Sequence, residues 1–185
     1  MDAKKMEQGL ALFLEGLEIE DSVFDKELAV KCMLEEWRDE FLSGYLQDPK
    51  ELLSSDVIAD ARQMVLMKDI SFVSFCAHHL TPISGVVHLA YLPNRKVIGL
   101  SRLVKLVRCF SRRLQLQERL TNQLASSLMT HMQAKGSACL IRADQFCVSA
   151  RGVRERTETI TTSFKGSFFT DGSLRRDFLE LCRDA

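Results

Sequence analysis

The sequence predicts an α+β fold with an antiparallel sheet. Three observations carry this prediction: helical periodicity near the N-terminus, a hairpin of short strands near the middle, and two further strands after a pair of helices. Strands joined by hairpins on either side of a helical pair favour antiparallel pairing over a parallel, doubly wound sheet. With 185 residues, 46% of them apolar, the chain is long enough for one domain with a substantial core.

The first elements are predicted to be two helices. Apolar residues recur at spacings of three and four over 2–17, which marks one face of a helix. A second helix is expected over 26–41, and Gly44 suits a left-handed C-terminal cap beyond it. Residues 45–55 are expected to form a loop.

The next elements are predicted to be strands. Residues 63–75 are rich in Val, Ile and Phe, and residues 85–92 alternate between two faces as a strand does. A turn at 93–95 then leads into 96–100, so that these two segments form a hairpin. Ser101 is placed to cap the helix that follows.

A longer helix is expected over 117–132, because apolar residues recur there at every fourth position. Gly136 would close it. The segments 137–150 and 157–168 are predicted to be two more strands, the second rich in Thr as a half-exposed strand would be. A last helix begins at about Leu174.

Charge and composition exclude several kinds of partner. Lys plus Arg and Asp plus Glu are each 25, so the formal net charge is zero and no overall field favours nucleic acid or a membrane surface. No stretch reaches the roughly 18 apolar residues of a membrane helix, and the N-terminus lacks a small-residue cleavage site. The six cysteines form no dense framework and are expected to be reduced. We therefore expect a cytoplasmic protein.

Cysteine and histidine side chains at 76–79 predict a metal site. Cys76, Ala77, His78 and His79 lie where a strand runs into a loop, and thiolate with imidazole is a zinc ligand set. Cys147, near the middle of a later predicted strand, is the best-placed third ligand. Three protein ligands leave a coordination position open, as in catalytic zinc sites. The alternative is that both cysteines are buried as small hydrophobic residues.

Polar residues near the second helical pair fit a guanine nucleotide. Gln117 and Glu118 open a helix, and a Glu carboxylate can accept two N–H donors from the amide and amino edge of guanine. The simpler explanation is that Glu118 stabilises the positive end of the helix dipole. A basic cluster precedes them, and either forms a solvated helix face or holds phosphates near Ser101. Its members are Arg102, Lys105, Arg108, Arg112 and Arg113.

These residues lie in an ordered run of motifs that resembles GTP cyclohydrolase I. The motifs are C-x-H-H, GLS, SRRLQ-Q-ERLT, C-x-x-x-RG and the tail TITTSFKGSF. The similarity covers about residues 60–182. It implies the tunnelling fold, in which antiparallel strands and two helices from each subunit form a homodecamer of two pentamers. Residues 1–58 would be an N-terminal helical region and 59–185 the tunnelling-fold domain.

The resemblance also implies a reaction, the conversion of GTP to 7,8-dihydroneopterin triphosphate and formate. By position, Cys76, His79 and Cys147 correspond to the zinc ligands and His78 to a catalytic acid/base. Gln117 and Glu118 match the guanine clamp. The groups that hold ribose and triphosphate correspond to Ser101, Arg102, Lys105 and Arg151.

The sequence departs from the family pattern at three places. Ala77 replaces the Glu of the usual C-E-H-H, and Gln145 stands where the family carries a His, two residues before the last zinc ligand. The stretch 29–32 lacks the phosphate-binding Arg of the family's T-P-x-R. Gln145 can form hydrogen bonds but cannot titrate, so the step that uses this group should slow by about 10²- to 10⁴-fold.

We therefore expect a zinc-dependent cyclohydrolase acting on GTP or a related guanine nucleotide. Zinc-bound water would attack C8 and open the imidazole ring, and the reaction would then stop or proceed in altered form. Two alternatives are a full GTP cyclohydrolase I and a zinc- and nucleotide-binding paralogue without turnover. An open metal position argues against the latter.

Overall fold

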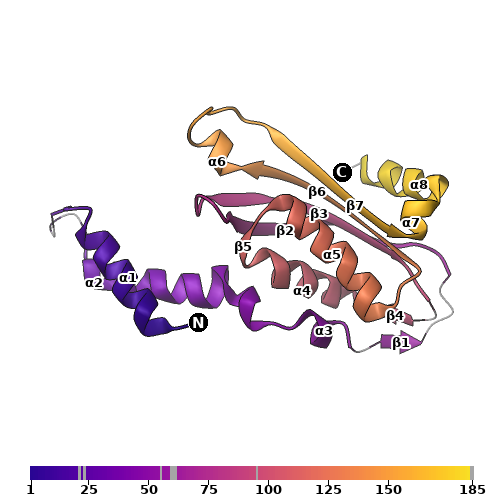
Figure 1. The fold of residues 1–185 in the computed structure, drawn as a ribbon, viewed down its shortest axis with the longest axis horizontal. Helices are drawn as coiled ribbons and strands as arrows, with labels where there is room; N and C mark the ends of the chain where they lie inside the picture. The colour runs from indigo at the N-terminus through magenta and orange to yellow at the C-terminus, as the bar shows by residue number, and fades with distance from the viewer. Residues whose placement is uncertain (21, 23, 55, 59–61, 95, 184–185) are drawn as a thin grey trace. The chain divides into compact units, whose positions relative to one another are not determined.

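The chain forms two compact units, Met1–Ser43 and Gly44–Ala185 (Figure 1). The structure, a computed structural model, describes all residues except 21, 23, 55, 59–61, 95 and 184–185. The domain boundary predicted between 58 and 59 adjoins residues that are outside the described ones, so that division stays a prediction.

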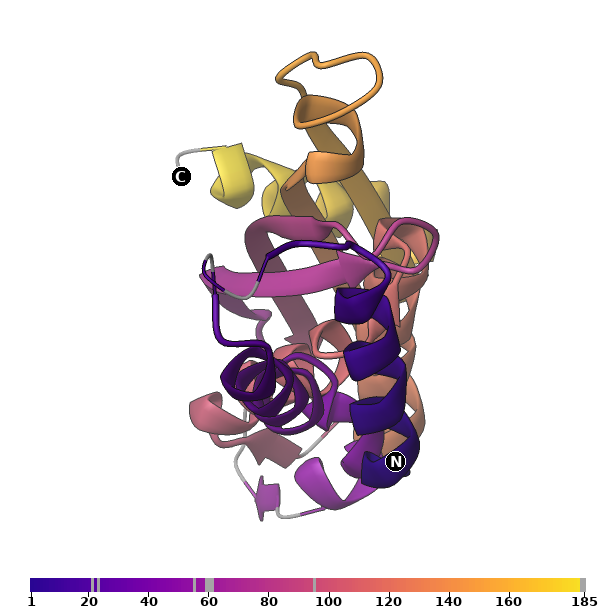
Figure 2. The ribbon, with the colours of Figure 1, turned by 90° about the vertical axis from the view of Figure 1, so that its left-hand side faces the viewer.

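The N-terminal unit consists of the two predicted helices. They are α1 (Ala3–Glu15) and α2 (Lys26–Glu35), which lie side by side (Figure 2). Asp2 and Asp25 cap them, because their carboxylates accept hydrogen bonds from the first-turn N–H groups of Lys5 and Leu28 at 3.2 and 3.0 Å. The second helix continues as a π-helical turn, η1 (Glu36–Phe41).

Gly44 is not the left-handed cap that was predicted. It lies in a 3₁₀ turn, η2 (Ser43–Leu46), and the positive-φ glycines among the described residues are Gly152 and Gly166. A Cβ at Gly44 would overlap the carbonyl oxygens of Cys109 and Arg112. Close approach between two backbone segments therefore explains this glycine.

The segment predicted as a loop, 45–55, contains more regular structure than expected. A short helix, α3 (Pro49–Leu52), is capped by Asp48. The predicted hairpin of 85–92 with 96–100 is wrong, because β4 (Lys96–Ile98) pairs instead with β1 (Asp56–Ile58) in a separate two-stranded sheet. Three-residue strands carry too little pattern for their partner to be identified from sequence.

The main sheet has five strands in the order β5-β2-β3-β6-β7, and its long strands pair with one another antiparallel. Only the short β5 runs parallel to its neighbour, β2. The bounds are β2 Val65–Cys76, β3 Pro82–Leu92, β5 Leu114–Gln115, β6 Gly136–Gln145 and β7 Glu158–Gly166.

Two helices cover one face of this sheet, α4 (Leu100–Ser111) on β2 and α5 (Gln117–Met132) on β6 and β7 (Figure 1). Their apolar faces meet alternate strand residues, among them Val87 and Leu89, which are fully buried. This antiparallel sheet with two helices confirms the predicted α+β class and tunnelling fold. The predicted residues at two helix ends were wrong, however. Gly99 rather than Ser101 is the N-cap of α4, and Gly136 opens β6 rather than closing α5.

The predicted strand 137–150 ends early, at Gln145. Gln145 pairs with Ile83 near the start of β3, so the residues beyond it have no β3 partner and turn into a helical segment, α6 (Phe146–Ser149). Cys147 consequently lies on a helical turn, not in mid-strand as predicted.

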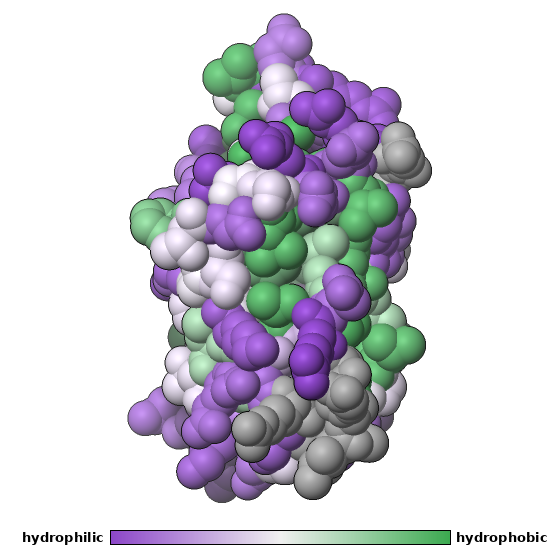
Figure 3. Space-filling model, turned by 90° about the vertical axis from the view of Figure 1, so that its right-hand side faces the viewer, coloured by the Kyte–Doolittle hydropathy of each residue, from purple (hydrophilic) through white to green (hydrophobic). Residues whose placement is uncertain are grey.

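The chain ends with two helices, α7 (Ser167–Thr170) and α8 (Gly172–Arg183). They build a second apolar cluster on the other face of the sheet, centred on Phe168 and Phe178. Apolar side chains also gather along the middle of the face at this end of the unit (Figure 3). Exposed apolar residues of α7 and α8 include Phe169 and Leu181.

Candidate metal centre

Three predicted ligands converge at one end of the main sheet. Cys76 ends β2, His79 lies in the turn that follows, and Cys147 lies on α6. Their ligand atoms lie within 4.8 Å of one another, and Sγ of Cys76 is 3.6 Å from Nδ1 of His79. Cys76 is buried, Cys147 half-buried and His79 exposed, so the group opens to solvent on the histidine side.

The sheet register brings these residues together. Both β2 and β6 pair with β3, where Phe75 faces Pro82 and Gln145 faces Ile83. The ends of β2 and β6 are therefore separated by one strand, and each is followed directly by a ligand-bearing turn.

Backbone hydrogen bonds hold the turn after β2 from two sides. Within the turn, the Cys76 N–H donates to the Thr81 carbonyl at 2.8 Å and the Leu80 N–H donates to the Cys76 carbonyl at 2.9 Å. From outside, the Ala77 N–H donates to the Gln115 carbonyl on β5 at 3.0 Å. The turn is thus held both by its own hydrogen bonds and by one to the neighbouring strand.

The donor set fits zinc. In a tetrahedral site with a Zn–S distance of about 2.3 Å and a Zn–N distance of about 2.0 Å, sulfur and nitrogen lie about 3.5 Å apart, close to the 3.6 Å between Cys76 Sγ and His79 Nδ1. Burial raises the pKa of the Cys147 thiol, the neighbouring Cys76 raises it further, and Arg151 lowers it. A bound cation reverses this preference, because a coordinating thiol is deprotonated.

Gln145 and Gln117 form a direct pair beside this group. The Gln145 Nε2 donates to Oε1 of Gln117 at 2.6 Å. The Gln117 side chain is only 2% exposed, and its Nε2 donates to the Thr159 carbonyl at 2.9 Å and to Thr161 Oγ1 at 3.2 Å. Glu118, the next residue, is exposed in the first turn of α5.

The other predicted site residues lie on three different elements. His78, Ser101, Lys105 and Arg151 are exposed. Arg102 is turned toward α3, because its Nη1 donates to the Leu52 carbonyl at 2.7 Å.

Sequence reasoning missed the residues that support the site. Gln115 is buried, and its side-chain Nε2 donates to the Phe110 carbonyl and to Oε1 of Gln123, each at 2.8 Å. Thr121 and Thr161 share a hydrogen bond at 2.6 Å. The Thr-rich strand was a usable signal for Thr161. Nothing local marks Gln115, whose role depends on the parallel pairing of β5 with β2.

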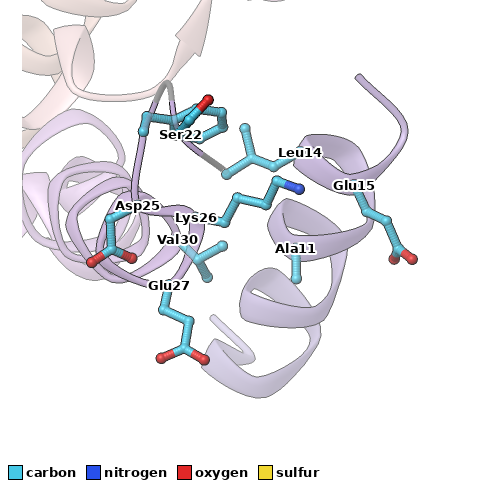
Figure 4. A pocket seen from close by; sticks show the side chains of 9 residues that line it. Ala11, Leu14, Glu15, Ser22, Asp25, Lys26, Glu27 and Val30 are labelled. Atoms are coloured by element: carbon cyan, nitrogen blue, oxygen red, sulfur yellow. The ribbon is translucent and has the colours of Figure 1, made fainter. Parts of the chain in front are cut away.

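Two hollows are lined by residues other than the three predicted ligands. One, of about 790 Å³, lies between the two helices of the N-terminal unit, where Ala11 and Leu14 of α1 face Lys26 and Val30 of α2 (Figure 4). The other, of about 520 Å³, lies over β3, β6 and the start of β7. Neither is lined by Cys76, His79 or Cys147. Among the described residues, no helix is both long enough and apolar enough to span a bilayer.

The fold and the clustered side chains define the class of protein: a tunnelling-fold protein with a Cys-His-Cys group that can hold a metal ion and whose Cys147 lies two residues beyond the half-buried Gln145, which pairs with the buried Gln117. The sequence model of GTP cyclohydrolase I matches residues 20–183. The chain therefore belongs to the GTP cyclohydrolase I family.

Individual relatives agree with this family. A protein of Campylobacter lari named GTP cyclohydrolase 1 is 47% identical over 149 residues, covering 79% of this chain and 78% of the relative. A protein of Clostridium perfringens with the same name is 37% identical over 182 residues, covering 98% of each.

Two solved structures show weaker likeness. Archaeosine synthase QueF-Like in the apo form has a TM-score of 0.43 at 18% identity, covering 54% of this chain and 92% of that one. Dihydroneopterin aldolase from Burkholderia thailendensis bound to guanine has a TM-score of 0.40 at 14% identity, covering 62% and 93%.

Proposed function

We propose that this protein is a zinc-dependent cyclohydrolase that opens the imidazole ring of GTP or a related guanine nucleotide. The observation that carries the proposal is the convergence of Cys76, His79 and Cys147 in a member of this family. In this proposal, residues 59–185 are the catalytic domain and residues 1–58 an N-terminal helical region.

The three ligands would hold zinc with one coordination position open. A zinc ion held by these three side chains would supply the chemistry of metal-activated water, whose pKa is lowered to about 7, for attack at C8 of guanine. His78, exposed beside His79, is proposed to move protons to and from the purine ring. The Cys76 turn contributes rigidity, since three backbone hydrogen bonds hold its ligands in place.

Substrate binding is assigned to the polar groups around α4, α5 and α6. Glu118 would accept hydrogen bonds from N1–H and the 2-amino group of guanine, with Gln117 beside it. The phosphates and ribose would be held by Ser101, Arg102, Lys105 and Arg151. Arg102 would first have to leave the Leu52 carbonyl.

The extent of the reaction depends on Gln145. A carboxamide does not ionise near neutral pH and so cannot act as a general acid or base, and we propose that ring opening outpaces the later steps or that the reaction stops after it. A full GTP cyclohydrolase I reaction, giving 7,8-dihydroneopterin triphosphate and formate, is the second candidate. The Clostridium perfringens relative, which covers 98% of this chain, favours it.

We propose a homodecamer of two pentamers as the working assembly, in the cytoplasm. Strand β7 forms an edge of the main sheet, and Val73 and Ile160 on the sheet are 52% and 55% exposed. Sheet edges and exposed apolar residues of this kind are commonly covered by subunit contacts.

Incubation of the purified protein with GTP, GDP, GMP and dGTP, followed by mass spectrometry, tests the proposal. A product heavier by one water without formate supports arrested ring opening, and formate with a fluorescent pterin after oxidation supports the full reaction. Unchanged nucleotides throughout would refute both and favour a binding protein without turnover. A gain of pterin in the double variant Gln145→His and Ala77→Glu would locate the altered step.

A further inference from the structure

The Gln117 side chain has one possible orientation. Its amide group lies between two carbonyl oxygens, those of Thr159 at 2.9 Å and Ile141 at 3.3 Å, and the side chain of Gln145. A carbonyl can only accept, so the NH₂ group must face Thr159 and Ile141. The Oε1 atom of Gln117 therefore faces Gln145.

Hydrogen bonds beyond Gln117 close a directional circuit. The Thr121 hydroxyl donates to the Gln117 backbone carbonyl at 2.7 Å, so the 2.6 Å contact between Thr121 and Thr161 must use the Thr161 proton. The Thr161 oxygen is then free to accept from Gln117 Nε2 at 3.2 Å. The two hydroxyl protons each have one assignment, and the two Nε2 protons of Gln117 are shared among three acceptors, so that no donor in the circuit is left unused.

Gln145 joins this circuit to the metal group. It is the last residue of β6, two positions before Cys147, and its Nε2 donates to Gln117 at 2.6 Å. Gln117 is the first residue of α5, and Glu118 follows it in the same helical turn. One hydrogen bond thus connects the turn that carries Cys147 to the turn that carries Glu118.

The circuit also limits what Gln117 can do. Its NH₂ group is fully used, and only one lone pair of its Oε1 atom remains. With 2% of its side chain exposed, it offers a base almost no surface. Glu118 is exposed and keeps both carboxylate oxygens available.

We infer that Gln145 is a positioning residue that acts through Gln117 to fix Glu118, the residue that recognises the guanine base. This inference rests on the proposed function for its substrate class. Positioning requires a hydrogen bond but no ionisable group, so Gln145 can perform it. Gln117 then supports Glu118 and does not contact the base directly.

A double-mutant cycle tests this inference with nucleotides that cannot be opened. In 7-deaza-GTP, carbon replaces N7, so binding is measured without turnover, and 7-deaza-ATP reports preference for the base. We expect Gln145→Leu and Gln117→Leu each to lower the preference for 7-deaza-GTP about tenfold, the value of one well-formed hydrogen bond. Because both act through one contact, the double variant should show the same tenfold loss.

Two controls make the result specific. Zinc content should stay at the wild-type value in both variants, which separates loss of positioning from damage to the metal group. Thr162→Val, which changes the next residue of β7 after Thr161, should bind both nucleotides as the wild type does. If either leucine variant fails to fold, Gln145→Asn shortens the side chain by one methylene and should give the same loss.

Three outcomes would overturn the inference. Unchanged preference in Gln145→Leu would show that Gln145 does not position the clamp, and a hundredfold loss in the double variant would show two independent contacts. A wild-type protein that binds neither nucleotide would refute the proposed function itself, and the inference with it.

Discussion

The Sγ atom of Cys76 lies 3.6 Å from Nδ1 of His79, across a turn that three backbone hydrogen bonds hold in place. This distance is close to the separation of a sulfur and a nitrogen ligand in a tetrahedral zinc site, about 3.5 Å. The turn therefore presents two ligands at the correct separation, and Cys147 approaches from a different element.

Removal of one cysteine ligand should abolish stable metal binding. We expect about one zinc per chain in the purified protein and at least a tenfold lower content in Cys76→Ala and in Cys147→Ala, because two ligands bind zinc weakly. Elemental analysis after gel filtration measures this. Cys32→Ser, a change at an exposed cysteine of α2, is the matched control and should keep its zinc. Equal zinc content in all four proteins would rule out this ligand set.

Loss of the Glu118 charge should weaken guanine recognition. Glu118→Gln keeps the size of the side chain but removes its charge and replaces one acceptor oxygen by an NH₂ group, which would face an N–H donor of guanine, so kcat/KM for GTP should fall about 100-fold. Inosine triphosphate lacks the 2-amino group and should be affected less. Steady-state kinetics with both nucleotides would check this, with Glu180→Gln on α8 as the control. Equal losses for both nucleotides would mean that Glu118 does not bind the 2-amino group.

Gly44→Ala should destabilise the protein by about 2–4 kcal/mol, because the new Cβ would overlap the carbonyls of Cys109 and Arg112. Gly9→Ala is the matched control. Gly9 lies within α1 with open space around its Cβ position, so alanine should be neutral or stabilise by up to about 1 kcal/mol. Urea denaturation measures both. Similar free energies of unfolding for the two variants would contradict the close approach described at Gly44.

Acid should destabilise the protein through His88. This side chain is 0% exposed, its Nε2 has no hydrogen-bond partner among the described residues, and burial lowers its pKa. Lys68 and Arg142 lower the pKa further, whereas Asp69, with an oxygen 3.9 Å from Nδ1, raises it less than burial lowers it.

The sign of this effect follows from proton binding. Below the ordinary histidine pKa of about 6.5, the unfolded chain binds a proton that the folded chain resists, so stability is present above this pH and is lost as the pH falls. Between pH 7.5 and 5, the Tm should therefore drop more in the wild type than in His88→Leu, as thermal unfolding at each pH would measure. His131→Asn, on α5, should behave as the wild type does. If the Tm of the wild type and of His88→Leu fell equally with pH, His88 would be excluded as the source of the acid sensitivity.

Elements with a strong repeating pattern could be predicted from the sequence, whereas elements defined by distant partners could not. The helix over 117–132 was correct to the residue, because its apolar residues repeat over four turns. The hairpin after β3 failed because β4 pairs with β1, about 40 residues earlier in the chain. The strand through Cys147 failed because the pairing of β6 with β3 ends at Gln145.

The site residues also differ in how far they could be predicted, according to whether their partners are near or distant in the sequence. Cys76 and His79 are three residues apart, and their local spacing was enough to suggest a shared metal. The pair of Gln145 and Gln117 is 28 residues apart and exists only because β6 and α5 pack together. The sequence therefore indicated that Gln145 was unusual but not what it contacts.

The fate of carbon 8 in GTP labelled with ¹³C at that position tests the central claim most directly. When the zinc-containing protein is followed by ¹³C NMR, we predict that the purine C8 signal is replaced by that of a formamide carbon retained on the nucleotide, and that Cys147→Ala abolishes this change. Complete conversion of the label to free formate would establish the full reaction instead. A purine C8 signal that persists unchanged in the zinc-containing protein would contradict the proposed cyclohydrolase activity.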